Sequence, residues 1–195
     1  MKYLFTYLII LLFTHFSSAQ PLTHEDFGRL MPSIKQENWK STFDESSKLL
    51  YREPNDTSDY HAIILYIHIF SGAGLVSQKQ MSYKTLKDSI LKDQGQRIIM
   101  PSHPITYKDG QLKHVKLEIS DTSNRAFTVA TNNSGTSIMC FEYFNFKDKI
   151  NVNDFPINAY VRCGGILDKI EMNPNKSTIW ILRLHVKDAF LRRTN

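Results

Sequence analysis

The chain has 195 residues, of which 42% are hydrophobic and 22% are charged, so its composition is that of an ordinary globular protein with one domain or two small ones. The formal net charge is +5. Basic residues are dispersed along the chain, and the only dense pair is Arg192 and Arg193, so the charge pattern disfavours nucleic acid as a partner.

Residues 1–19 have the layout of a secretory signal peptide. Lys2 gives a positive start, Leu4 to Phe16 form an apolar run, and the small residues Ser-Ser-Ala precede a cleavage site at Gln20. The apolar run is shorter than the roughly 20 residues that span a bilayer. We therefore expect an exported protein, periplasmic or secreted, with no transmembrane span after cleavage; an uncleaved N-terminal anchor is the alternative.

Residues 20–105 are predicted to form a mainly helical region. Thr23 precedes a turn that contains acidic side chains, which is typical of a capped helix start. Pro32 is expected to interrupt this helix, after which Ser33 would cap a longer one over residues 34–52.

The segment 60–76 is apolar nearly all round, as in a buried helix or a buried strand, and its length favours a helix. Gly72 and Gly74 are small enough to let another element approach this helix closely. Ser82 then resembles the N-cap of a short helix over residues 83–92.

The pattern changes to alternating apolar and polar residues after a short strand expected near residues 96–106. From residue 106 onward about five strands alternate with turn clusters, which predicts a β-sandwich or a small barrel. The expected strands lie within residues 114–120, 126–131, 136–146, 158–170 and 177–191. The fold class is therefore α+β, with a helical N-terminal half packed on a β domain over residues 106–195.

Two of these strands carry a resemblance to a known fold. Val161, Cys163 and Gly165 match the V-x-V-x-G pattern of a bent strand, and the strand that ends at Asp188-Ala189 matches the returning strand that follows it. The C-terminal 85 or so residues thus resemble exported bacterial OB-fold proteins of the tRNA-anticodon-binding-like group. The resemblance implies a five-stranded OB-like barrel, with an open Greek-key sandwich as the alternative.

Candidate ligand-binding residues are aromatic, basic or glycine positions on the predicted strands: Phe141, Tyr143, Phe144, Arg162, Gly164, Gly165 and Trp180. Adjacent strand residues face opposite sides, so Tyr143 and Phe144 cannot both lie on one binding face. The two glycines predict a barrel corner, and a ligand lying against bare backbone is the alternative.

Cys140 and Cys163 are the candidates for a disulfide, because an exported protein meets an oxidising compartment. We expect them on adjacent strands. The alternative is that both are small buried side chains with free thiols.

No catalytic, metal or cofactor site is predicted. His61 and His68 are seven residues apart, which is wider than the usual spacing of a zinc pair on a helix. Ser102 and His103 are neighbours on an expected strand and would point to opposite faces, so they do not form a nucleophile and base.

These observations favour an exported, non-enzymatic binding or scaffolding protein of the bacterial cell envelope. Its ligand would be a peptide, a glycan or a partner protein on the face of the β domain. The alternative is a secreted hydrolase with a site between the helical half and the β domain, centred on His103.

Overall fold

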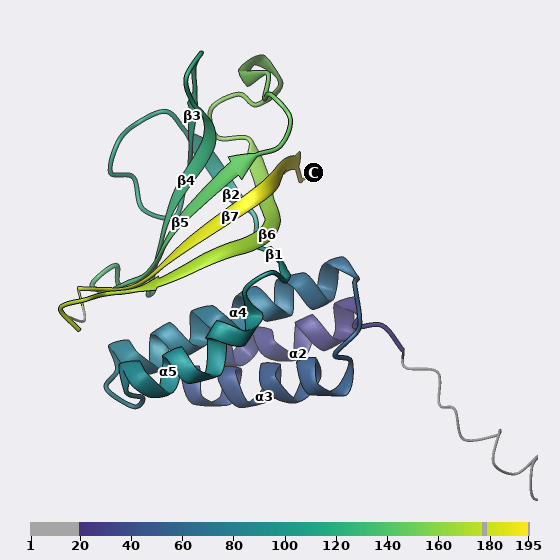
Figure 1. The fold of residues 1–195 in the computed structure, drawn as a ribbon, viewed down its shortest axis with the longest axis vertical. Helices are drawn as coiled ribbons and strands as arrows, with labels where there is room; N and C mark the ends of the chain where they lie inside the picture. The colour runs from purple at the N-terminus through teal and green to yellow at the C-terminus, as the bar shows by residue number, and fades with distance from the viewer. Residues whose placement is uncertain (1–19, 177–178, 195) are drawn as a thin grey trace, which may run out of the picture.

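The computed structural model describes residues 20–176 and 179–194. The predicted signal peptide, residues 1–19, lies outside the described residues. The described chain is α+β, with a layer of helices packed beneath a twisted sheet (Figure 1). Four α-helices belong to the N-terminal half of the described chain: α2 (His24–Lys35), α3 (Trp39–Arg52), α4 (Asp59–Ser77) and α5 (Tyr83–Ile90).

The first helix starts where the sequence predicts, and it ends later. Thr23 and Asp26 form a capping box, in which each side chain accepts a hydrogen bond from the other residue's backbone N–H. The prediction that Pro32 ends this helix is wrong, because Pro32 lies inside α2. The break comes at Glu37, whose φ of 54° is left-handed, and Asn38 rather than Ser33 caps α3.

Helix α4 is the centre of the helical layer, as its apolar sequence predicts. It packs against the other three α-helices and against strands of the sheet. Gly74 allows this packing, since a Cβ there would lie 2.5 Å from the indole ring of Trp39. Helix α4 is long and apolar enough to cross a membrane, but 83% of its apolar window is buried inside the fold, as in a core helix.

The sheet contains seven strands in the order β1-β6-β2-β3-β4-β5-β7, and β6 also pairs with β7. The strands are β1 (Arg97–Ile99), β2 (His103–Thr106), β3 (Val115–Ile119), β4 (Asn124–Thr131), β5 (Ile138–Phe146), β6 (Tyr160–Met172) and β7 (Trp180–Arg193). The described residues also contain two short 3₁₀-helices, η1 (Leu91–Asp93) and η2 (Val152–Asp154).

The strand count differs from the predicted five. Residues 97–106 form two short strands of the sheet, β1 and β2. The sheet therefore begins earlier in the chain than the predicted boundary at residue 105. Pro101 separates them, because proline has no N–H to donate to a sheet. Both strands pair with β6, so this segment extends the sheet rather than linking two separate halves.

Gly164 and Gly165 lie where β6 is crowded from both sides. Ile99 of β1 is opposite Gly164, and the register with β7 shifts between Gly164 and Ile166. A Cβ at Gly164 would lie 2.8 Å from the carbonyl oxygen of Ile98, and one at Gly165 would lie 2.7 Å from that of Lys187. The close neighbours of these glycines are therefore β1 and a bulge against β7.

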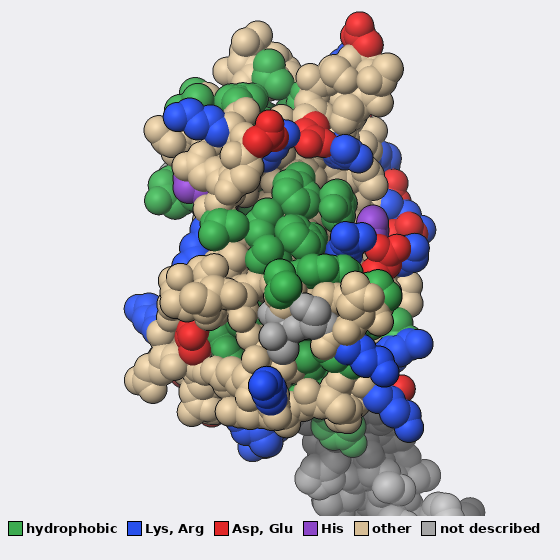
Figure 2. All heavy atoms as spheres, turned by 90° about the vertical axis from the view of Figure 1, so that its left-hand side faces the viewer, with side chains coloured by type: hydrophobic (Ala, Val, Ile, Leu, Met, Phe, Trp, Pro, Cys, Tyr) green, Lys and Arg blue, Asp and Glu red, His purple; other side chains and the backbone are tan. Residues whose placement is uncertain are grey.

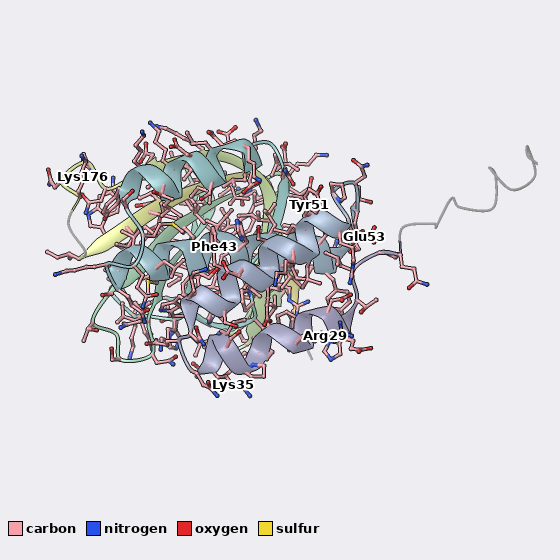
Figure 3. The ribbon with its side chains drawn as sticks, turned by 90° about the horizontal axis from the view of Figure 1, so that it is seen from below. Arg29, Lys35, Phe43, Tyr51, Glu53 and Lys176 are labelled. Carbon is pink, nitrogen blue, oxygen red and sulfur yellow. The ribbon has the colours of Figure 1, made fainter. Side chains whose placement is uncertain are left out.

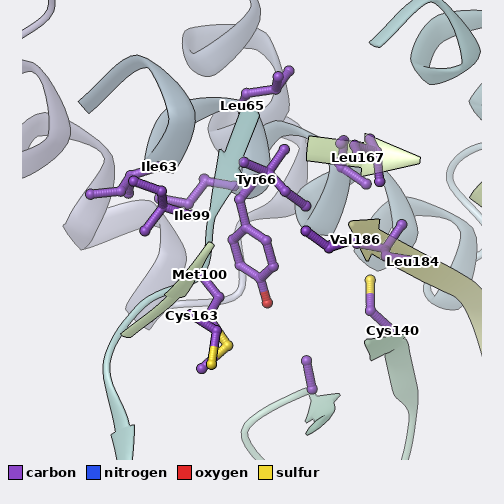
Figure 4. Close-up of a cluster of buried hydrophobic side chains, with 14 of the residues drawn as sticks. Ile63, Leu65, Tyr66, Ile99, Met100, Cys140, Cys163, Leu167, Leu184 and Val186 are labelled. Carbon is purple, nitrogen blue, oxygen red and sulfur yellow. The ribbon is translucent and has the colours of Figure 1, made fainter. Parts of the chain in front are cut away.

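The prediction that Cys140 and Cys163 lie on adjacent strands is wrong. Cys140 is opposite Leu182 of β7, and Cys163 is opposite Leu191 of the same strand, so β7 lies between them. Both cysteines are fully buried with free thiols, and Figure 4 shows them apart within the hydrophobic cluster. They match the alternative of small buried side chains.

A buried hydrogen bond joins α4 to the sheet inside the core. Tyr66 of α4 donates a hydrogen bond of 2.6 Å to the carboxyl group of Glu142 on β5, and Thr128 of β4 donates a second one. Glu142 is 1% exposed. Burial raises its pKa to about 7, although the two hydrogen bonds oppose this rise.

Candidate aromatic binding face

The alternation of β5 divides the predicted aromatic residues between the two sides of the sheet. Phe144 is fully buried in the core, whereas Phe141 and Tyr143 lie on the other side and are partly exposed. The expectation that Tyr143 and Phe144 face opposite sides is confirmed. Phe144 thus belongs to the core and not to a binding face.

Neighbouring strands add rings to the exposed side. Phe127 of β4 is opposite Tyr143, and their ring centroids are 5.0 Å apart. Phe127 also lies 6.0 Å from Phe141, which in turn lies 6.0 Å from Trp180 of β7. These distances are in the range of favourable aromatic pairs, so the four rings form a continuous surface across three strands.

Two side chains of β7 complete this surface. His185 stacks on Tyr143 at 5.1 Å, and the guanidinium carbon of Arg183 lies 4.5 Å from the centroid of Trp180 and 5.9 Å from that of Phe141. We call the set Phe127, Phe141, Tyr143, Trp180, Arg183 and His185 the aromatic face. Contacts between arginine and an aromatic ring are attractive, so the two rings help to hold Arg183 on this surface.

The carboxylate of Glu171 lies beside the two basic members of the aromatic face. Glu171 of β6 is opposite Arg183 in the strand register, and one of its carboxylate oxygens lies 3.4 Å from the Nε2 atom of His185. The Nε atom of Arg183 is buried and has no hydrogen-bond partner among the described residues. No ion pair joins Arg183 to a carboxylate among these residues, so a partner's carboxylate would not displace an existing ion pair there.

Sequence reasoning found three members of the aromatic face and missed the other three. Phe141, Tyr143 and Trp180 were predicted as ligand-binding residues, whereas Phe127, Arg183 and His185 were not. The alternation in the β7 sequence WILRLHV places Arg183 and His185 on one side, and this was the available signal.

Arg162, Gly164 and Gly165 do not join the aromatic face. Arg162 is opposite Arg192 near the C-terminal end of β7, whereas Trp180 begins that strand. The two glycines lie between β1 and the β7 bulge. The predicted ligand-binding residues therefore fall into three groups. Phe141, Tyr143 and Trp180 belong to the aromatic face, Phe144 is buried in the core, and Arg162 and the two glycines lie elsewhere on β6.

The surroundings of His103 bear on the hydrolase alternative. Burial lowers the pKa of His103, and the charges of His114 and Lys113 lower it further, whereas a hydrogen bond with the Lys113 backbone raises it. No ion pair joins His103 to a carboxylate among the described residues. Residues 20–176 and 179–194 contain no group of three histidine, cysteine or acidic side chains suited to hold a metal ion.

Figure 2 shows hydrophobic side chains gathered over the sheet, with Lys, Arg, Asp and Glu side chains around them. The pattern of an apolar centre and a polar border is common to interaction surfaces. No family model, curated protein or solved structure matches this chain.

Proposed function

We propose that the protein is an exported, non-enzymatic binding module of the bacterial cell envelope, and that the aromatic face docks a protein partner. The observation that carries the proposal is the continuous set of partly exposed rings with Arg183 lying on two of them. Tryptophan, tyrosine and arginine are the residue types that most often dominate binding energy at protein interfaces.

The chemistry of the face favours a particular partner. Four rings offer apolar area, and the guanidinium of Arg183 offers hydrogen-bond donors and forms no ion pair with a carboxylate among the described residues. A partner segment that brings an apolar side chain to the rings and a carboxylate to Arg183 would satisfy both. The alternative ligand is a glycan, and the photo-crosslinking and column experiments distinguish a protein from a glycan.

The fold proposed for this module is an OB-like barrel. The strand pairings run β2–β3–β4–β5–β7–β6 and return to β2, and β5 pairs with β7 in parallel. This closed circuit supports a barrel over an open sandwich, with β1 added outside the circuit on β6. In this arrangement the aromatic face lies on the outer side of the wall formed by β4, β5 and β7.

The export proposal rests on residues 1–19 and on the apolar run within them. Fusion of residues 1–30 to a reporter enzyme that is active only outside the cytoplasm would test it. We expect activity outside the cytoplasm and loss of residues 1–19 from the mature protein by mass spectrometry. A reporter that stays in the cytoplasm would refute export.

Site-specific photo-crosslinking tests the binding face. A photoreactive phenylalanine analogue replaces Phe141, and in the matched control it replaces Tyr160, which is 56% exposed at the start of β6. In intact cells we expect protein adducts from position 141 that are absent from position 160 and reduced at least fivefold by Arg183→Gln.

Equal adducts from both positions, or none from position 141, would count against a docked protein. Retention of the purified protein on an envelope-glycan column, lost in Trp180→Ala and kept in Tyr160→Ala, would instead make the occupant a glycan.

A further inference from the structure

A second candidate site lies in the helical layer, away from the aromatic face. A pocket of about 250 Å³ opens between α3, α4 and η1. Its lining includes Tyr51 at the end of α3, His61 and His68 of α4, and the neighbours Lys92 and Asp93. Figure 3 shows the helical layer from below, with Tyr51 and Glu53 near the C-terminal end of α3.

Asp93 is the unusual group in this pocket. It is only 4% exposed, and its Oδ2 atom has no hydrogen-bond partner among the described residues. Buried carboxylate oxygens without a partner are rare because each one costs free energy. Burial raises the pKa of Asp93 to about 6, so at neutral pH the group is a carboxylate that lacks a donor.

Lys92 supplies the opposite charge without neutralising Asp93. Its ammonium lowers the pKa of Asp93 and that of His68, so it is close enough for each to sense its charge. No ion pair joins Lys92 to Asp93 within the described chain, and Lys92 is exposed at the rim. The pocket therefore presents an unpaired anion inside and an unpaired cation at its mouth.

The two histidines add polar, uncharged groups to a wall that also contains Leu50, Pro54 and Leu65. Burial lowers the pKa of His61 and, together with the charge of Lys92, lowers that of His68 to about 4. The Nδ1 atom of His68 lies 3.2 Å from the hydroxyl of Ser46, which fixes the ring. At neutral pH both rings are neutral, so they can accept or donate hydrogen bonds without competing for a cation.

We propose that this pocket binds a small zwitterion, with a protonated primary amine on Asp93 and an anionic group at Lys92. The ammonium gives Oδ2 of Asp93 the donor that it lacks, and the ligand's anionic end pairs with the lysine. A volume of 250 Å³ equals that of roughly eight water molecules in the liquid, so the ligand is the size of a free amino acid.

A series of linear amino acids tests the proposal and measures the separation of the two charges. Binding of glycine, β-alanine, 4-aminobutyrate and 5-aminovalerate to the mature protein would be followed by isothermal titration calorimetry and by NMR shifts of the His61 and His68 rings. We expect one length to bind best, at least tenfold more tightly than n-butylamine or butyrate.

Matched variants locate the binding. Asp93→Asn and Lys92→Gln should each weaken the best ligand at least tenfold, whereas Asp88→Asn and Lys87→Gln, at exposed positions of α5, should leave its affinity unchanged. Asn retains the shape of Asp93, and a thermal melt of each variant checks that it folds. Because Lys92 is exposed, we expect Lys92→Gln to fold, so this variant still tests the proposal if Asp93→Asn does not fold.

Three results would overturn the proposal. The first is that no compound in the series binds at millimolar concentration, which would mean that water alone satisfies Asp93. The second is equal affinity for n-butylamine and for the best zwitterion. The third is unchanged affinity in Asp93→Asn or Lys92→Gln.

Discussion

The buried carboxyl group of Glu142 gives a quantitative prediction about the core. Its pKa in the folded protein is about 7, against 4.5 for an exposed glutamate. Because the folded pKa is the higher one, the native state holds the proton more tightly than the unfolded state does. Tighter proton binding by native Glu142 therefore adds to the free energy of unfolding. This contribution is complete below pH 4.5 and is lost as the pH rises to 7 and above.

The size of this loss follows from the shift. Each pKa unit corresponds to about 1.4 kcal/mol, so the total loss of unfolding free energy is about 3 kcal/mol. Most of this loss falls between about pH 5 and pH 8. Glu142→Gln mimics the protonated carboxyl group: its carbonyl oxygen accepts from Tyr66 and its amide donates to Thr128. The variant should therefore lack this part of the pH dependence.

Urea unfolding of both proteins, followed by tryptophan fluorescence from pH 5 to pH 8.5, measures the effect. We expect the difference in unfolding free energy, variant minus wild type, to grow by about 2 to 3 kcal/mol in favour of the variant. Taking this difference cancels other titrating groups, such as His68 and Asp93, because they are common to both proteins. Parallel stability curves would refute the reasoning about Glu142.

Two further predictions concern packing and thiols. Gly165→Ala should lower the unfolding free energy by about 2 kcal/mol, because the new Cβ would lie 2.7 Å from the carbonyl oxygen of Lys187. Gly28→Ala should raise the unfolding free energy by about 1 kcal/mol, because alanine favours helix α2 more than glycine does and its Cβ would have no neighbour within 4 Å. Urea titrations that rank the two variants the other way would contradict this. Cys140 and Cys163 should not react with a thiol reagent in the native protein and should both react in urea, since burial raises the pKa of each. A native disulfide found by mass spectrometry would disprove the strand assignment.

Local signals in the sequence predict most of the helices. Ser58 and Ser82 cap α4 and α5 with their side chains, and such caps depend only on neighbouring residues. The error at Pro32 has a local cause too, because a proline removes one hydrogen bond but leaves the following turn able to continue. The true break depends on the left-handed backbone of Glu37, for which the sequence carries no strong signal.

The sheet shows where sequence reasoning stops. Alternation predicts which residues of one strand share a side, and it assigns Phe141 and Tyr143 correctly to one face. It does not tell which strands are neighbours. The pairing of β5 with β7 brings Arg183 to Phe141 and separates Cys140 from Cys163, and this crossover depends on the whole chain.

Asp93 escaped sequence reasoning for the same reason. It ends a short 3₁₀-helix in a polar stretch, and nothing nearby in the sequence marks it as buried. In the fold it lines a pocket together with residues of α3 and α4, which are distant from it in the sequence. A buried charge of this kind is recognisable only when the packing of distant segments is known.

Helix α4 lines the pocket and also contacts β5, the strand that carries Phe141 and Tyr143. His61 and His68 line the pocket, whereas Tyr66 lies two residues from His68, on the opposite side of the helix, and reaches Glu142 beneath the aromatic face. A ligand in the pocket would affect the aromatic face if it moved this helix. Because α4 is buried along most of its length and close-packed, we expect no such movement. The affinity for the zwitterion should then be the same in wild type and in Tyr143→Ala, and a change of more than threefold would show that α4 couples the two sites.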